Sequence, residues 1–195
     1  MNQEAAEKHL TALLTTGLGL DLSDPNLVDT PKRMAKMYIN EFFANVDKEF
    51  NDFKSFPNNN HYDQIIMFDH IHFTSMCSHH FLPFTGLAWL LYIPKDKLIG
   101  ASKAARLIEH YAKRPQLQEN LAHQVANRFW HTIKPLGVMV LMQAVHACMS
   151  CRGVRQYAGA SMGTNIVKGY FLEQPHVKAE AMEMIKISQS VTHRS

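Results

Sequence analysis

The sequence predicts an α+β fold in which a helical N-terminal segment precedes a mostly antiparallel sheet. In the first third of the chain, apolar residues recur with the helical spacing of about 3.6 residues. The remainder contains short apolar runs bounded by turn residues, which are typical of strands. These runs come in pairs with helical segments grouped between them, whereas a parallel α/β fold alternates strands and helices. At 195 residues, 46% of them hydrophobic, the chain is long enough for one compact core.

The N-terminal segment is expected to be helical. Residues 5–14 have helical apolar spacing and are followed by two glycines that end the helix. A second helix is expected from Thr30, an N-cap residue that precedes a proline at the first helical position. The turn-rich stretch 57–60 then marks a boundary. We therefore predict an N-terminal helical region of residues 1–60 and a catalytic domain of residues 61–195.

The second region alternates between strand and helix patterns. An apolar row at every fourth position predicts that the longest helix buries one face. This row is Leu117, Leu121, Val125, Phe129 and Ile133. Strands are expected at residues 65–73, 87–93, 137–148 and 164–171. Helices are expected at residues 101–113, 116–133 and 179–187.

The net charge of +3 is unevenly distributed. Residues 1–60 carry 9 acids and 6 bases, a net charge of −3, and residues 61–171 carry 5 acids and 11 bases, a net charge of +6. The basic middle favours an anionic ligand, although a solvated basic surface has the same composition. The bases gather at helix starts and near the cysteines, without a stripe of interleaved aromatic residues, so we expect no nucleic-acid partner.

Composition also indicates a compartment. The chain has no run of about 18 apolar residues, and residues 1–7 are polar and acidic, so we expect no membrane partner and no secretory signal. Three cysteines are too few, and odd in number, for a disulfide framework, so metal binding or reactive thiols are expected instead. We expect a cytoplasmic protein.

Two short segments carry the residue types that bind zinc. One runs from Cys77 to His80, and the other contains His146, Cys148 and Cys151. Zinc prefers thiolate and imidazole ligands in tetrahedral sets. By spacing alone, the pair Cys77 and His80 and the pair Cys148 and Cys151, each separated by two residues, favour a closed structural site with four protein ligands.

Strand geometry favours an open site instead. In an extended strand His146 and Cys148 share a face, and Cys151 points away. Three ligands, Cys77, His80 and Cys148, would then leave a fourth position for water. His79 and His146 would flank that water as proton carriers, although His146 could equally be a packed core residue and His79 could itself bind metal. A bend at residue 150 would restore the closed site, so both alternatives stay open at this point.

Charged residues also stand at helix starts. Ser102, Lys103 and Arg106 fall within the first turn of an expected helix, where cations oppose the helix dipole. A phosphate group there would meet side chains and free backbone N–H groups, although ordinary surface bases are the alternative. Glu119, in the first turn of the next helix, is favoured by the dipole and needs no further role. Arg152 places a cation beside the second ligand segment.

These residues together resemble the type I GTP cyclohydrolase family. The likeness extends from about residue 4 to residue 187, and an N-terminal Asp29-Thr30-Pro31-x-Arg33 belongs to it. Five further motifs carry it in order: Cys77-Ser78-His79-His80-Phe81-Leu82-Pro83-Phe84-x-Gly86, Tyr92-Ile93-Pro94, Ile99-Gly100-Ala101-Ser102-Lys103-x-x-Arg106, Arg114-Pro115-Gln116-x-Gln118-Glu119, and Val145-His146-x-Cys148-Met149-x-x-Arg152-Gly153-Val154.

The resemblance implies a site and a reaction. It implies a zinc cofactor and GTP as substrate, with the guanine ring opened to give 7,8-dihydroneopterin triphosphate and formate. It implies that the ligands are Cys77, His80 and Cys148, that the acid/base pair is His79 and His146, that Ser102, Lys103, Arg106 and Arg152 hold the ribose and triphosphate, and that Gln118 and Glu119 read the guanine. The implied fold is the tunnelling fold, an antiparallel sheet with helices on one side, assembled into a homo-oligomer, usually a decamer, with active sites at subunit boundaries.

Two departures from the family pattern leave room for other functions. Ser78 stands where the family usually has Glu, and residues 157–164 replace a Thr-rich run. The loss of a carboxylate beside the metal changes its local charge and support. The alternatives are therefore a related tunnelling-fold enzyme acting on another purine or pterin, and a non-enzymatic structural-zinc module with Cys151 as a ligand.

Overall fold

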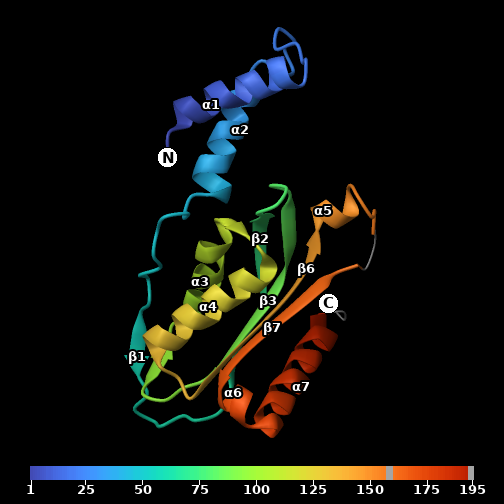
Figure 1. The fold of residues 1–195 in the computed structure, drawn as a ribbon. Helices are drawn as coiled ribbons and strands as arrows, with labels where there is room; N and C mark the ends of the chain where they lie inside the picture. Colours follow the sequence, from blue (N-terminus) through green and yellow to red (C-terminus); the bar gives the residue numbers. More distant parts are fainter. Residues whose placement is uncertain (157–159, 193–195) are drawn as a thin grey trace.

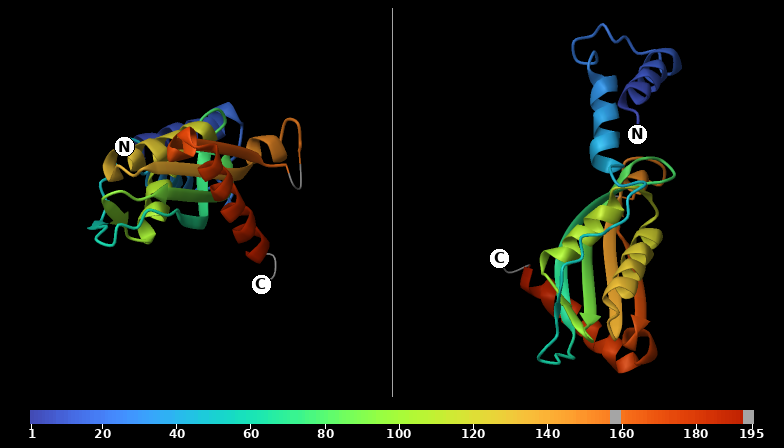
Figure 2. Two further views of the ribbon diagram at one scale, coloured as in Figure 1. Left: turned by 90° about the horizontal axis from the view of Figure 1, so that it is seen from below. Right: turned by 90° about the vertical axis from the view of Figure 1, so that its left-hand side faces the viewer.

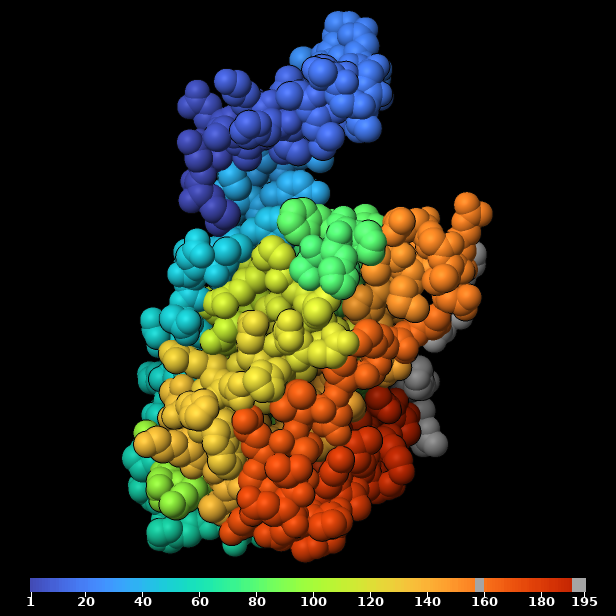
Figure 3. All heavy atoms as spheres, in the orientation of Figure 1, coloured from blue at the N-terminus to red at the C-terminus, as the bar shows by residue number. Residues whose placement is uncertain are grey.

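The computed structural model describes residues 1–156 and 160–192. Its N-terminal part is helical, as predicted, and consists of α1 (Gln3–Ala12), η1 (Leu13–Gly17), α2 (Thr30–Met37) and η2 (Tyr38–Phe42). α1 and α2 pack on one another and stand clear of the sheet (Figures 1 and 3), whereas Tyr38 of η2 contacts the ring of Phe81 after β2, with 6.4 Å between ring centroids. The predicted N-cap was wrong by one residue. Thr30 is the first helical residue, and Asp29 precedes it at the N-cap position, where it forms an ion pair with Arg33 at 3.2 Å.

The sheet has five strands in the order β5-β2-β3-β6-β7. Every pair is antiparallel except β2 with β5, which pair in parallel over two residues, so the prediction of a mostly antiparallel sheet is confirmed. A separate two-stranded sheet lies at one end of the molecule (Figure 1). The strands are β1 (Ser55–Pro57), β2 (Ile66–Cys77), β3 (Pro83–Ile93), β4 (Lys97–Ile99), β5 (Pro115–Gln116), β6 (Gly137–His146) and β7 (Met162–Gly169).

Two helices, α3 (Ser102–Ala112) and α4 (Gln118–Ile133), cover one face of the sheet and form the main core with it. The fourth-position row on α4 faces the sheet as predicted, since its members from Leu121 to Ile133 are at most 3% exposed. α4 is therefore an amphipathic helix whose apolar face is buried against the sheet.

The other face of the sheet also carries helices, so the expectation of helices on one side was wrong. Short α6 (Tyr170–Glu173) leads into α7 (Pro175–Thr192), which lies across the face opposite α3 and α4 (Figure 2). A second apolar cluster fills this layer, with Trp89 and Met139 from the sheet and Ala181 and Ile185 from α7. The cause is that β3 and β6 are apolar on both faces, and apolar surface left exposed is unfavourable.

A segment without helix or strand, residues 43–54, connects the N-terminal helices to β1 and is called the strap below. It runs along α3 and α4 (Figure 1) and buries Phe50, which is 5% exposed and contacts the ring of Phe53 edge to face. Its amide at Asn45 donates to the Lys113 carbonyl at 3.2 Å. Within the described residues, no helix combines the length and the apolar character needed to cross a membrane.

Candidate metal and catalytic site

The first metal-ligand candidates lie on a tight turn at the end of β2. Cys77 is the last residue of β2, and its amide donates to the Leu82 carbonyl at 2.9 Å while its carbonyl accepts from the Phe81 amide at 2.8 Å. Phe81 adopts a positive φ of 51°, which reverses the chain. The turn brings His80 Nδ1 to 4.0 Å from Cys77 Sγ.

Cys148 lies next to Cys77 and His80, but it stands on a helix and not on the predicted strand. The expected strand to residue 148 was wrong, because β6 ends at His146 and a short helix, α5 (Ala147–Ser150), follows. The pairing of His146 with Phe84 brings the end of β6 to the start of β3, next to the turn. The ligand atoms of Cys77, His80 and Cys148 consequently lie within 4.8 Å of one another.

Cys151 does not join this group. Its thiol is exposed and donates to the Ala147 carbonyl at 2.8 Å, which closes the turn after α5. Burial raises the pKa of the Cys148 thiol, the neighbouring Cys77 thiol raises it further, and Arg152 opposes the rise. A divalent cation bound at this group would stabilise the thiolate form of Cys148.

His146 is held between a ring and an amide. Its imidazole stacks on Phe84, with ring centroids 4.7 Å apart and planes 2° from parallel, and its Nε2 donates to Gln118 Oε1 at 2.8 Å. Burial lowers the pKa of His146, and the carboxylate of Glu119 acts in the opposite direction. The ring is thus fixed in position and favours its neutral form.

The Gln118 side chain is buried and fully engaged inside the chain. Besides accepting from His146, it donates through Nε2 to the carbonyls of Met142 and Met162, at 3.1 and 2.9 Å. It therefore joins α4 to β6 and β7, and its amide oxygen faces His146. Glu119 beside it is exposed.

The other predicted residues near the metal group are exposed. His79 lies on the turn with its ring edge-on to His80, 6.1 Å between centroids, and Ser78 occupies the same turn with its amide donating to the Gln116 carbonyl at 2.9 Å. Arg152 follows α5 and is also exposed. The second departure from the family pattern, residues 157–164, lies partly outside the described residues.

Of the predicted phosphate-binding residues, Arg152 lies beside the metal group, whereas Ser102, Lys103 and Arg106 lie along α3. The end of α3 adjoins the site, since Ser75 of β2 donates to the Ala112 carbonyl at 2.7 Å. Ser102 and Lys103 lie at the start of this 11-residue helix, roughly 14 to 15 Å along its axis from Ala112 at about 1.5 Å per residue, and Arg106 lies about 9 Å from Ala112. Lys103 and Arg106 both contact Asp52 of the strap, a residue that no sequence motif had indicated.

Comparison with known proteins decides the family. The sequence profile of GTP cyclohydrolase I matches residues 6–186. The chain belongs to the GTP cyclohydrolase I family. Among its relatives, GTP cyclohydrolase 1 of Bacillus subtilis (strain 168) is 40% identical over 187 residues, which cover 95% of this chain and 97% of that protein. GTP cyclohydrolase 1 of Streptococcus mutans serotype c is 41% identical over 186 residues, covering 94% of this chain and 95% of that protein.

A likeness to a solved structure is weaker. The crystal structure of the archaeosine synthase QueF-Like in the apo form is 16% identical, with a TM-score of 0.45, and covers 54% of this chain and 94% of that chain. A similarity of this size does not identify a fold. Membership of the GTP cyclohydrolase I family therefore rests on sequence, over nearly the whole length of the chain.

Proposed function

We propose that this member of the GTP cyclohydrolase I family is a zinc-dependent enzyme that converts GTP and water into 7,8-dihydroneopterin triphosphate and formate. The observation that carries the proposal is the convergence of Cys77, His80 and Cys148 within 4.8 Å, with His146 fixed two residues from one of them. The chain also shares about 40% of its residues with proteins named for this activity, over almost their full length.

The donor set fits zinc. Two thiols and one imidazole are ligands that Zn²⁺ prefers, and three protein ligands leave one position of a tetrahedron for water or substrate. When bound, zinc would supply Lewis-acid chemistry and lower the pKa of water toward neutrality. Cys77 and Cys148 would bind it as thiolates and His80 through its neutral ring.

The two further histidines would move protons. His146 is held against Phe84, and burial lowers its pKa, so the ring is unprotonated and free to accept a proton. His79, exposed on the turn between two ligands, would be its partner in proton transfer to the purine. Gln118 and Glu119 at the start of α4 would read the guanine, with the exposed Glu119 accepting from its N–H edge, and the Gln118 side chain would also hold His146.

The substrate site would be completed by a second copy of the chain. Ser102 and Lys103 lie at the far end of α3 from the metal group of their own chain, and Arg106 lies one turn further along the helix. These three residues would bind the triphosphate at the metal group of a neighbouring chain, together with Arg152. This arrangement requires a homo-oligomer, for which we propose a decamer of tunnelling-fold subunits. The regions 1–60 and 61–195 would be its helical and catalytic parts, and the enzyme would work in the cytoplasm.

A direct assay tests the proposal. Zinc-loaded protein is incubated with GTP, the products are oxidised, and pterin fluorescence and released formate are measured. Both products are expected in equal amounts. If neither pterin nor formate forms while the protein retains its zinc, the alternative of a non-enzymatic structural-zinc module is favoured. Ring opening of another purine or a pterin but not of GTP would indicate that the change to Ser78 accompanies a change of substrate.

A further inference from the structure

The two cations at the start of α3 already hold an anion from the same chain. Lys103 Nζ lies 2.5 Å from Asp52 Oδ1, and Arg106 Nη1 lies 2.9 Å from Asp52 Oδ2, so each carboxylate oxygen serves one cation. Lys103 is buried, at 8% exposure, and Asp52 is the partner that neutralises it. These are the cations to which the proposed function assigns the triphosphate.

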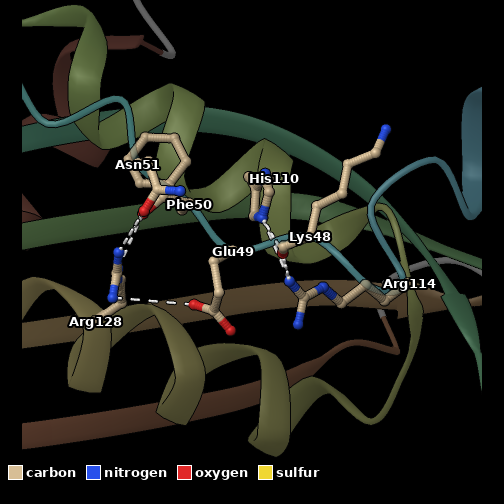
Figure 4. Close-up of polar contacts among 7 residues, drawn as sticks. All are labelled: Lys48, Glu49, Phe50, Asn51, His110, Arg114 and Arg128. Carbon is tan, nitrogen blue, oxygen red and sulfur yellow. Dashed lines mark hydrogen bonds and ion pairs between the residues drawn. The ribbon is translucent and has the colours of Figure 1, made fainter.

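Asp52 is presented by an anchored segment. Packing of Phe50 and Phe53 against one another and of Phe53 against Phe129 fixes the strap on either side of it. Polar side chains also hold the strap in place (Figure 4). His110 of α3 and Arg114, the residue before β5, contact the Lys48 carbonyl. Arg128 of α4 donates to the Phe50 carbonyl and to the side-chain oxygen Oδ1 of Asn51. The carboxylate is thus kept beside both cations at a high effective concentration.

We infer that Asp52 is a built-in competitor of the substrate triphosphate at Lys103 and Arg106. The inference rests on the proposed function, since it takes these cations to be the triphosphate site. An incoming polyphosphate must displace the carboxylate before it can bind both cations. When only a fraction of the protein is competent to bind, the apparent affinity falls by that fraction. Asp52 therefore weakens triphosphate binding while it keeps the buried Lys103 paired in the empty site.

Removal of the charge at Asp52 tests this. Calorimetric titration of the zinc-loaded oligomer with inorganic triphosphate gives the dissociation constant directly, without turnover. For Asp52→Asn we expect this constant to fall about three- to tenfold, as for displacement of an ion pair of modest strength, and KM for GTP to fall with it. Asp52 is 49% exposed, so the change leaves the core intact, and Asp52→Ser provides a second variant.

Matched variants separate the outcomes. Asp47→Asn makes the same charge change at an exposed position of the strap away from both cations, and should leave triphosphate binding unchanged. If both Asp52 variants bind triphosphate no better than the unmodified chain, while Lys103→Met binds it more weakly, the competitor role is wrong and the anion site stands. If Lys103→Met also binds triphosphate as before, the assignment of α3 to the triphosphate is wrong, and the inference fails with it.

Discussion

At the residue scale, Cys148 and Cys151 should respond differently to removal, although only two residues lie between them. Cys148 contributes a ligand atom to the metal group, whereas the Cys151 thiol is exposed and bonded to a backbone carbonyl. We expect Cys148→Ala to lose its zinc, measured by elemental analysis after dialysis, and Cys151→Ala to keep the zinc content of the unmodified chain. Zinc loss in Cys151→Ala would instead establish the closed, four-ligand site.

His146 offers a second residue-scale prediction, about mechanism. If its ring transfers protons, His146→Ala should retain zinc and GTP binding yet lose turnover by about 10²–10⁴-fold. If it is only a packed residue, the change should lower the free energy of unfolding by about 2 kcal/mol or more and leave activity at low temperature largely intact. Measurements of kcat, bound zinc and Tm on one preparation distinguish the two. His123→Ala, an exposed histidine on α4, is the control.

At the scale of elements, the pairing of β3 with β6 depends on one glycine. A Cβ at Gly86 would meet the Gln143 carbonyl oxygen and lie 2.6 Å from Ala144 Cα, so the two strands can approach only where no side chain intervenes. We expect Gly86→Ala to lower the free energy of unfolding in urea by about 3 kcal/mol, the upper part of the usual range for overpacking. Activity should fall too, because the same pairing positions His146 opposite Phe84.

Gly163 provides the matched control for this prediction. It pairs with Gln143 from the opposite side, on β7, and a Cβ there would find nothing within 4 Å. Gly163→Ala should therefore change the free energy of unfolding by about 1 kcal/mol or less. Equal effects of the two substitutions would show that close strand approach is not what requires Gly86.

Helices and strands could be predicted from the sequence where the spacing of apolar residues along the chain distinguishes a helix from a strand. The buried row of α4 and the apolar runs of β2, β3 and β7 were recognisable because spacing alone selects helix or strand. The end of β6 was missed, since residues 147–150 turn into a helix without a glycine or proline to signal it. The second helical layer had a signal that was not used: residues 138–142 are all apolar, as expected for a strand covered on both faces.

The candidate site could be predicted only as far as its motifs extend. The spacings of Cys77, His80 and Cys148 marked them as candidate ligands together with Cys151, and the family resemblance selected the three that lie together. The contacts of Gln118 with His146 and of Asp52 with Lys103 join residues 28 and 51 positions apart and depend on how α4 and the strap pack. A buried amide or an ion pair at that separation has no local sequence pattern.

At the scale of the whole molecule, the distance between the two groups of site residues predicts complementation. Cys148→Ala lacks a metal ligand, and Lys103→Met lacks a cation at the other end of α3, so each should be poorly active alone at low GTP concentration. In mixed oligomers, a site formed between subunits can combine an intact half from each chain. We expect co-expression of the two variants to restore activity well above that of either.

The control is formation of mixed oligomers, shown by affinity tags of different kinds on the two chains. Light scattering on the unmodified chain should give a mass several times 22.3 kDa. An active monomer, or tagged mixed oligomers without restored activity, would show that each chain contains a complete site.

The bonds of Gln118 also decide where His146 carries its proton. The amide nitrogen of Gln118 donates to the carbonyls of Met142 and Met162, so the amide oxygen is the atom that faces the imidazole of His146. An oxygen cannot donate, so the neutral ring must be the Nε2–H tautomer, with its lone pair on Nδ1. A proton that this ring takes up therefore arrives at Nδ1, while Nε2 keeps its bond to Gln118 in both charge states. The chain thus distinguishes two nitrogens that are nearly equivalent in free imidazole, and it does so with an uncharged side chain.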